Sequence, residues 1–133
     1  MFMRFHQFRQ RENGQALVEM ALVLPVLILI IFGIVEFGRI MNTYLIVTNA
    51  AREGARHGVV GGTDADIRDA VINNAYTLDP AKITVTISPA GSRTRGAPLT
   101  VQVSYSLDII APLIGVITGN PYIVTASTTM RVE

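Results

Sequence analysis

The sequence contains no cysteine, only two histidines and almost no net charge, and each shortage excludes a class of function. Without cysteine the chain forms neither disulfide bonds nor thiolate metal sites. His6 and His57 are far apart in sequence, and no metalloprotease, hydrolase or phosphate-binding motif accompanies them. A net charge of +1 leaves no electrostatic footprint for nucleic acid. We therefore expect no catalytic residues, metal, cofactor, nucleic-acid partner or small-molecule substrate.

The feature that is present is a long apolar run, residues 16–35, which contains a single acid, Glu19. About 20 apolar residues cover a hydrocarbon core of ~30 Å, so the run predicts a membrane-spanning helix over about 16–37. A carboxylate near bilayer depth costs about 2.5–3.5 kcal/mol on insertion scales, which makes Glu19 a candidate functional residue. Two interpretations stay open: Glu19 reaches the membrane interface without a specific partner, or it pairs with a positive charge at membrane depth.

The segment before the run, residues 1–14, is predicted to be a leader peptide, because it is short, polar and basic and ends at Gly14. It carries three arginines, whereas the twenty residues after Val35 carry two, so the positive-inside rule favours a cytoplasmic N-terminus. A conventional cleaved secretory signal is the rival interpretation. The apolar run is longer than the usual signal core of about 7–15 residues, and no small-x-small cleavage site follows it.

Helical spacing continues beyond the membrane, so one helix is predicted over residues 15–60, ended by Gly58, Gly61 and Gly62. Glu36 and Arg39 are three residues apart and are expected to pair where the helix leaves the membrane. Small residues at helical spacing let another backbone approach closely, and the second half carries such a stripe. The stripe packs either on this protein's own sheet or on another subunit. It consists of Ala50, Ala51, Gly54, Ala55 and Gly58.

Residues 63–133 predict a small extracytoplasmic domain. Thr63 or Asp64 is placed to cap a second helix, which should end before Pro80. Period-two alternation then predicts strands over 83–88, 99–107 and 122–132, with the first two joined by a polar loop. The acids Asp64, Asp66 and Asp69 resemble a weak calcium spacing, but favourable interaction with the helix dipole explains them better.

Residues 109–117, here called the apolar insert, are too short to span a membrane, and Pro112 and Gly115 argue against a regular helix. The insert can cover the sheet edge, touch the lipid surface or contact another subunit. The whole pattern predicts an α+β fold of pilin-like type. A long N-terminal transmembrane helix continues into a small domain with a second helix and a three-stranded antiparallel sheet.

Several motifs together resemble the TadE-like family, which comprises minor pilins or pseudopilins of the tight-adherence (Tad, or Flp) pilus. The resemblance is dense over residues 14–56 and looser beyond them. The motifs are Gly14-Gln15-Ala16-Leu17-Val18-Glu19, Leu22-Val23-Leu24-Pro25, Phe32-Gly33, Glu36-Phe37-Gly38-Arg39 and Thr48-Asn49-Ala50-Ala51-Arg52-Glu53-Gly54-Ala55-Arg56, with Ala126-Ser127-Thr128-Thr129-Met130-Arg131 in the final strand.

The resemblance implies that a prepilin peptidase of the inner membrane cuts between Gly14 and Gln15, and that Glu19 acts in assembly. It also implies other minor pilins, the major Flp pilin and the Tad membrane platform as partners. The protein would span the bacterial cytoplasmic membrane once, with the C-terminal domain outside or at the pilus surface. Two alternatives are an uncleaved, membrane-anchored structural or adhesion protein and a pseudopilin of a type II secretion system.

Overall fold

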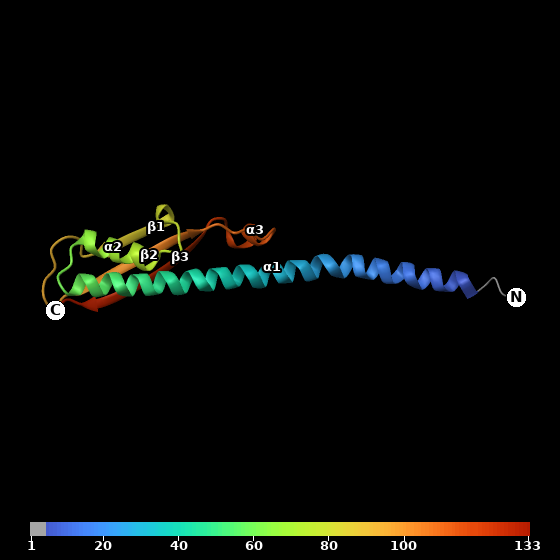
Figure 1. Cartoon of the computed structure of the whole chain (residues 1–133), viewed down its shortest axis with the longest axis horizontal. Helices are drawn as coiled ribbons and strands as arrows, with labels where there is room; N and C mark the ends of the chain where they lie inside the picture. Colours follow the sequence, from blue (N-terminus) through green and yellow to red (C-terminus); the bar gives the residue numbers. More distant parts are fainter. Residues whose placement is uncertain (1–4) are drawn as a thin grey trace. The chain divides into compact units, whose positions relative to one another are not determined.

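The computed structural model describes the backbone of residues 5–133 and the side chains from residue 12 onward. The chain divides into two compact units, with the boundary between Val35 and Glu36. Figure 1 shows the elements in chain order. They are α1 (Phe5–Val59), α2 (Asp64–Asn74), a 3-10 turn η1 (Pro80–Lys82), β1 (Ile83–Ser88), β2 (Pro98–Leu107), α3 (Ile114–Thr118) and β3 (Tyr122–Arg131).

Helix α1 begins at Phe5, earlier than residue 15, where the apolar pattern places its start. Residues 5–13 contain neither proline nor glycine and are rich in arginine and glutamine, which are good helix formers. The helix therefore continues through Gly14 into the segment predicted as a leader, of which residues 1–4 lie outside the described residues. It ends at Val59 because Gly61 takes a left-handed φ of 97°, and the Gly62 N–H bonds to His57 O at 2.9 Å.

Within the described residues, the strands form an antiparallel sheet in the order β1-β2-β3, as the sequence predicts. The central strand, β2, pairs along both edges, so that Val103 lies opposite Val85 on one side and Ala126 on the other. The polar segment between β1 and β2 is the expected long hairpin connection. The α+β fold class is thereby confirmed.

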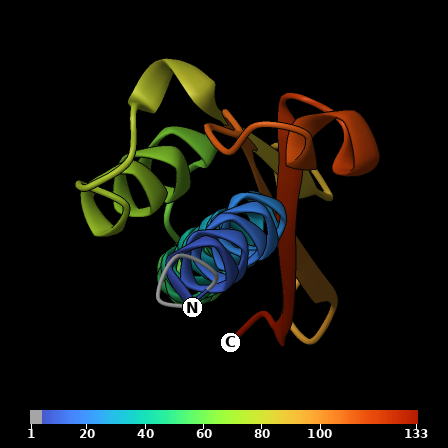
Figure 2. The ribbon, with the colours of Figure 1, turned by 90° about the vertical axis from the view of Figure 1, so that its right-hand side faces the viewer.

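One face of the sheet is covered by helices and the other is not. Alternate residues of β2 are buried, including Leu99, Val101 and Val103, and they pack with Val47 of α1 and Ile67 of α2 in one core. Figure 2 shows α2 and the sheet on different sides of α1 in this unit. On the uncovered face, hydroxyl pairs join neighbouring strands, with Thr100 and Thr129 at 2.8 Å. The period-two alternation therefore separates core from solvent.

Helix α2 begins with a reciprocal capping box. The Asp66 backbone N–H donates to Thr63 Oγ1 at 3.2 Å, and the Thr63 backbone N–H donates to Asp66 Oδ2 at 2.8 Å. The Thr63 backbone N–H and the Thr63 hydroxyl both donate to Asp66 Oδ2, and they lower the pKa of the Asp66 carboxyl from its ordinary value of 3.8, the backbone bond contributing most. The helix ends at Asn74, well before Pro80, and Leu78 packs on the core from the following turn.

The apolar insert divides into a buried and an exposed half. Ile109 and Ala111 are buried, and the Ala111 N–H is hydrogen-bonded to Glu36 of α1. The second half contains the short helix α3, which corrects the expectation that no regular helix forms here. Pro112 precedes α3 instead of interrupting it, and Gly115 costs a helix only about 1 kcal/mol. The large exposed side chains of the insert are those of Ile110, Leu113, Val116 and Ile117, and Pro112 is exposed beside them.

Candidate functional site

Gly14 and Gln15, the predicted processing residues, both lie inside α1 and are exposed. A Cβ atom at Gly14 would meet nothing within 4 Å, so packing does not require glycine there. Glycine lowers helix stability by about 1 kcal/mol relative to alanine, which makes the helix easiest to open at this point.

Glu19 is also exposed on α1, one helical turn after Gln15. Residues four apart on a helix are neighbours, separated by an axial rise of about 6 Å. A charge on the backbone nitrogen of Gln15 would therefore lie on the same face as the Glu19 carboxylate. The neighbouring Val18 and Met20 are exposed as well, so the Glu19 carboxylate is surrounded by an apolar helix surface.

The segment around Glu19 has the length and composition of a membrane span. Within the described residues, one helix qualifies, and its most apolar 18-residue window has a mean hydropathy of 2.8. None of that window is buried in the protein. Pro25 lies inside this helix and is compatible with a membrane span, because membrane helices tolerate proline.

Glu36 directly follows the apolar run, and its side chain is only 3% exposed. Arg39 Nη1 donates to Glu36 Oε1 at 2.6 Å, which confirms the predicted pair one turn apart. The backbone N–H of Ala111 donates to the other carboxylate oxygen at 3.2 Å. A buried carboxylate is costly unless it is paired and hydrogen-bonded, and here both of its oxygens have a donor. Glu36 thus attaches the apolar insert to α1 in the second unit.

No local sequence pattern predicts the bond between Glu36 and Ala111, because it joins positions 75 residues apart. A second contact strengthens the attachment, since Arg39 Nη2 also donates to the carbonyl oxygen of Asp108 at 3.3 Å. The signal that could have identified Glu36 is its place as the first charge after a long uncharged stretch. Sequence reasoning assigned it only the local pair with Arg39.

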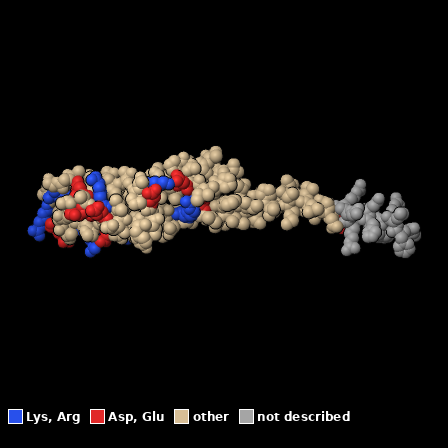
Figure 3. All heavy atoms as spheres, turned by 45° about the horizontal axis from the view of Figure 1, so that its top comes forward, with Lys and Arg blue, Asp and Glu red and all other residues tan. Residues whose placement is uncertain are grey.

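Asp108 lies at the start of the insert segment and pairs with Lys82 of η1. The hydrogen bond from Lys82 to this carboxylate raises the pKa of the lysine above its ordinary value of 10.5. Figure 3 shows that charged side chains gather on the surface of the second unit, while the described surface of the first unit is almost entirely uncharged. Arg39, Lys82 and Asp108 form one such group beside the apolar insert.

The small-residue stripe lies inside the second unit. Ala50, Ala51 and Ala55 are fully buried in its core. A Cβ atom at Gly54 would lie 2.6 Å from Val71 Cγ2, and one at Gly58 would lie 2.7 Å from Ile67 Cδ1 and would also clash with Leu99. The structure thus places the stripe inside its own chain, with α2 contacting both glycines and β2 contacting Gly58, where the sequence had suggested the sheet alone.

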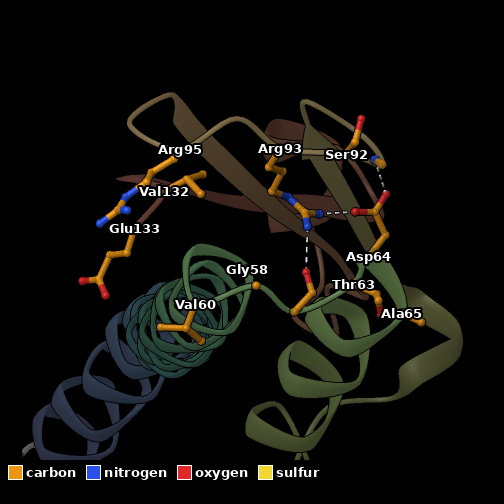
Figure 4. A pocket seen from close by; sticks show the side chains of 13 residues that line it. Gly58, Val60, Thr63, Asp64, Ala65, Ser92, Arg93, Arg95, Val132 and Glu133 are labelled. Carbon is orange, nitrogen blue, oxygen red and sulfur yellow. Dashed lines mark hydrogen bonds and ion pairs between the residues drawn. The ribbon is translucent and has the colours of Figure 1, made fainter.

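A hollow of about 810 Å³ opens at the N-terminus of α2. Figure 4 shows Arg93 and Asp64 directed toward each other beside it. The Arg93 guanidinium pairs with the Asp64 carboxylate and donates to Gly62 O at 2.7 Å, and the Gly91 N–H donates to Asp64 at 2.9 Å. These groups join the β1–β2 loop to α2. The Asp64 carboxylate is thus paired with an arginine. Among the described residues, no group of three or more His, Cys, Asp or Glu side chains is placed to hold a metal.

The fold and these side chains define a class: a small α+β domain carried by a helix long and apolar enough to cross a membrane. The family described as TadE-like protein matches residues 14–56, the stretch that begins at Gly14 and includes Glu19, Glu36 and the small-residue stripe. The match confirms the resemblance found in the sequence over residues 14–56. Neither the curated proteins nor the solved structures contain a match.

Proposed function

We propose that this chain is a minor pilin or pseudopilin of a Tad (Flp) pilus, and that a prepilin peptidase cuts it between Gly14 and Gln15. The observation that carries the proposal is the TadE-like match over residues 14–56, which coincides with the apolar helix bearing Gly14 and Glu19. The role is structural and non-enzymatic. The helix lies in the cytoplasmic membrane with its N-terminus inside, and the second unit lies outside.

The mechanism follows from the cost of an unpaired charge in lipid. Cleavage after Gly14 would create a free amine on Gln15, one turn from Glu19 on the same helix face. Each charge is expensive alone in the bilayer, whereas removing one partner of a buried pair costs about 3–5 kcal/mol. Pairing Glu19 with the amine of its own chain, or with that of a neighbouring subunit, would link extraction of the helix from lipid to docking in the fibre. Other minor pilins, the major Flp pilin and the Tad membrane platform are the proposed partners.

An uncleaved membrane anchor is the second candidate, and one observation favours it. Helix α1 is continuous through Gly14, so the bond to Gln15 is helical in this structure and must open before a peptidase can use it. Such an anchor would act as a structural or adhesion protein without entering a fibre. A pseudopilin of a type II secretion system would share the cleavage and the helix, but the TadE-like match favours the Tad system.

The test is the N-terminal residue and intact mass of the protein purified from native membranes. We expect a mature start at Gln15 that is lost in Gly14→Ala. Gly38→Ala is the matched control, because Gly38 lies in the same helix and a Cβ there also meets nothing within 4 Å. This control should be processed normally. A start at Met1 in the unmodified protein would contradict the processed-pilin proposal and favour the anchor.

A further inference from the structure

The exposed half of the apolar insert is an apolar surface without a partner among the residues that the structure describes. Val116 and Ile117 are 86% and 83% exposed, and Ile110 and Leu113 are also mostly exposed. Leu113 holds a left-handed φ of 67°, a conformation that leucine rarely adopts, as it enters α3. Four large, exposed aliphatic side chains in one short segment form an apolar patch of the kind that marks a binding surface.

The insert is held firmly in position within the second unit. Ile109 N–H donates to Asn120 Oδ1 at 3.1 Å, and Asn120 Nδ2 donates back to Ile109 O at 3.3 Å, which closes the segment at its base. Ala111 is bonded to the buried Glu36 carboxylate. The exposed side chains therefore belong to an anchored loop and not to a loose one.

The anchor point identifies the surface that the insert meets. Glu36 is joined by a peptide bond to Val35, the last residue of the uncharged stretch that runs from Met20. A membrane-spanning stretch ends at the lipid interface, so the first buried charge after it marks that level. Since the Ala111 N–H is bonded to Glu36, the insert is attached directly to the residue that follows the apolar run.

The chemistry of the segment fits lipid better than protein. Residues 109–123 contain no Asp, Glu, Lys or Arg, whereas protein interfaces surround an apolar centre with a polar rim. The partly exposed Tyr122 ends the segment, and tyrosine is enriched at membrane interfaces. Arg39 and Lys82 lie beside the insert, as basic side chains do at headgroup level.

We propose that the exposed half of the apolar insert lies in the interface of the bilayer that α1 crosses, as a second and shallow membrane contact. Before assembly, this contact would hold the second unit against the membrane surface. When α1 leaves the lipid, the apolar side chains of the insert would leave the membrane interface as well and become available for contact with another subunit. The inference rests on the proposed membrane-spanning role of α1, and the experiment below separates the two.

The experiment uses the full chain reconstituted in phosphatidylcholine–phosphatidylglycerol vesicles. Because the protein has no cysteine, a single introduced cysteine can carry an environment-sensitive fluorophore. The reporting variant is Val116→Cys, with Ile117→Cys as a second position if the first does not fold. Tyr76→Cys is the matched control, because Tyr76 is equally exposed, at 84%, but lies beyond the end of α2. Ile28→Cys reports on the apolar run itself.

At Val116 we expect quenching by lipids spin-labelled near the headgroup, and about threefold or greater protection from aqueous iodide relative to Tyr76, because interfacial segments sit at the headgroup–acyl boundary. Adding Ile110→Ser and Ile117→Ser should remove both effects. Equal iodide quenching at Val116 and Tyr76 would overturn the inference. Protection from iodide without lipid quenching would overturn it too, because it would indicate a second subunit. If Ile28 were not quenched by lipid, the spanning role itself would fail.

Discussion

Two glutamates of α1 occupy opposite environments, and each environment sets what the residue can do. Glu19 is exposed on an apolar helix surface, so its charge remains available for a partner outside the described contacts. Glu36 is buried with a donor on each carboxylate oxygen, so its charge is already used inside the second unit. The exposed Glu19 carboxylate is therefore suited to a role in assembly, whereas the hydrogen-bonded Glu36 carboxylate is suited to stabilising the fold.

The prediction at this scale concerns Glu36→Ala. The substitution leaves the Ala111 N–H and the Arg39 guanidinium without their acceptor, and hydrogen bonds to charged groups contribute about 1.5–3 kcal/mol each. We expect the free energy of unfolding to fall by about 2–3 kcal/mol in detergent, measured by urea denaturation followed by circular dichroism. The insert should also become accessible to protease.

Glu53→Ala is the control for this measurement, because Glu53 forms an exposed pair with Arg56 at the same spacing as Glu36 and Arg39. Exposed pairs are worth about 0–1 kcal/mol, so its effect should be small. Equal losses in the two variants would show that burial and the Ala111 bond contribute nothing at Glu36.

At the scale of elements, small residues in the second half of α1 allow close packing against α2. Gly54 and Gly58 face Ile67 and Val71 of α2, which are fully buried, so neither contact can relax by moving a side chain into solvent. The glycines thus set the distance between α1 and α2. The small-residue stripe resembles a helix interface of a membrane protein in sequence, but in the structure it packs inside the second unit.

We predict that Gly58→Ala destabilises the protein by a net amount of about 1–2 kcal/mol, because overpacking costs more than the helix propensity gained. Differential scanning calorimetry in detergent measures the change. In contrast, Gly38→Ala should be neutral or stabilising by up to about 1 kcal/mol, since a Cβ there meets nothing within 4 Å. If the Gly58 variant were as stable as the Gly38 variant, α1 and α2 could move apart without lowering the free energy of unfolding, and the prediction would be wrong.

At the scale of the whole molecule, the proposed mechanism is a helix stored in lipid and then withdrawn into a fibre. The apolar surface of α1 stabilises the stored state, and Glu19 opposes it by about 2.5–3.5 kcal/mol on insertion scales. Neutralising Glu19 should therefore strengthen retention in the membrane and weaken assembly.

The prediction is that Glu19→Leu is inserted and processed normally but is lost from the sheared pilus fraction and accumulates in the membrane fraction. Quantitative immunoblotting of both fractions measures this. Glu12→Gln is the control, because Glu12 lies before the proposed cut and would be absent from the mature subunit. Normal amounts of the Glu19 variant in pili would refute a role for the carboxylate in assembly.

The sequence alone determined the features that depend on local pattern. An uncharged stretch of sufficient length indicates a span, period-two alternation indicates half-buried strands, and a threonine three residues before an aspartate indicates a helix cap. The strands, the cap at Thr63 and the pair between Glu36 and Arg39 agree with these patterns. Local signals are readable because neighbours in the chain are neighbours in a helix or strand.

Tertiary structure alone decided the rest. Whether the small-residue stripe met its own sheet and second helix or another subunit depended on how distant segments packed, and spacing is the same in both cases. The bond from Ala111 to Glu36 and the division of the apolar insert into buried and exposed halves likewise join positions far apart in the chain. Such contacts form because the burial of apolar surface stabilises the packed unit as a whole. The sequence of one segment alone does not specify which distant segment it will contact.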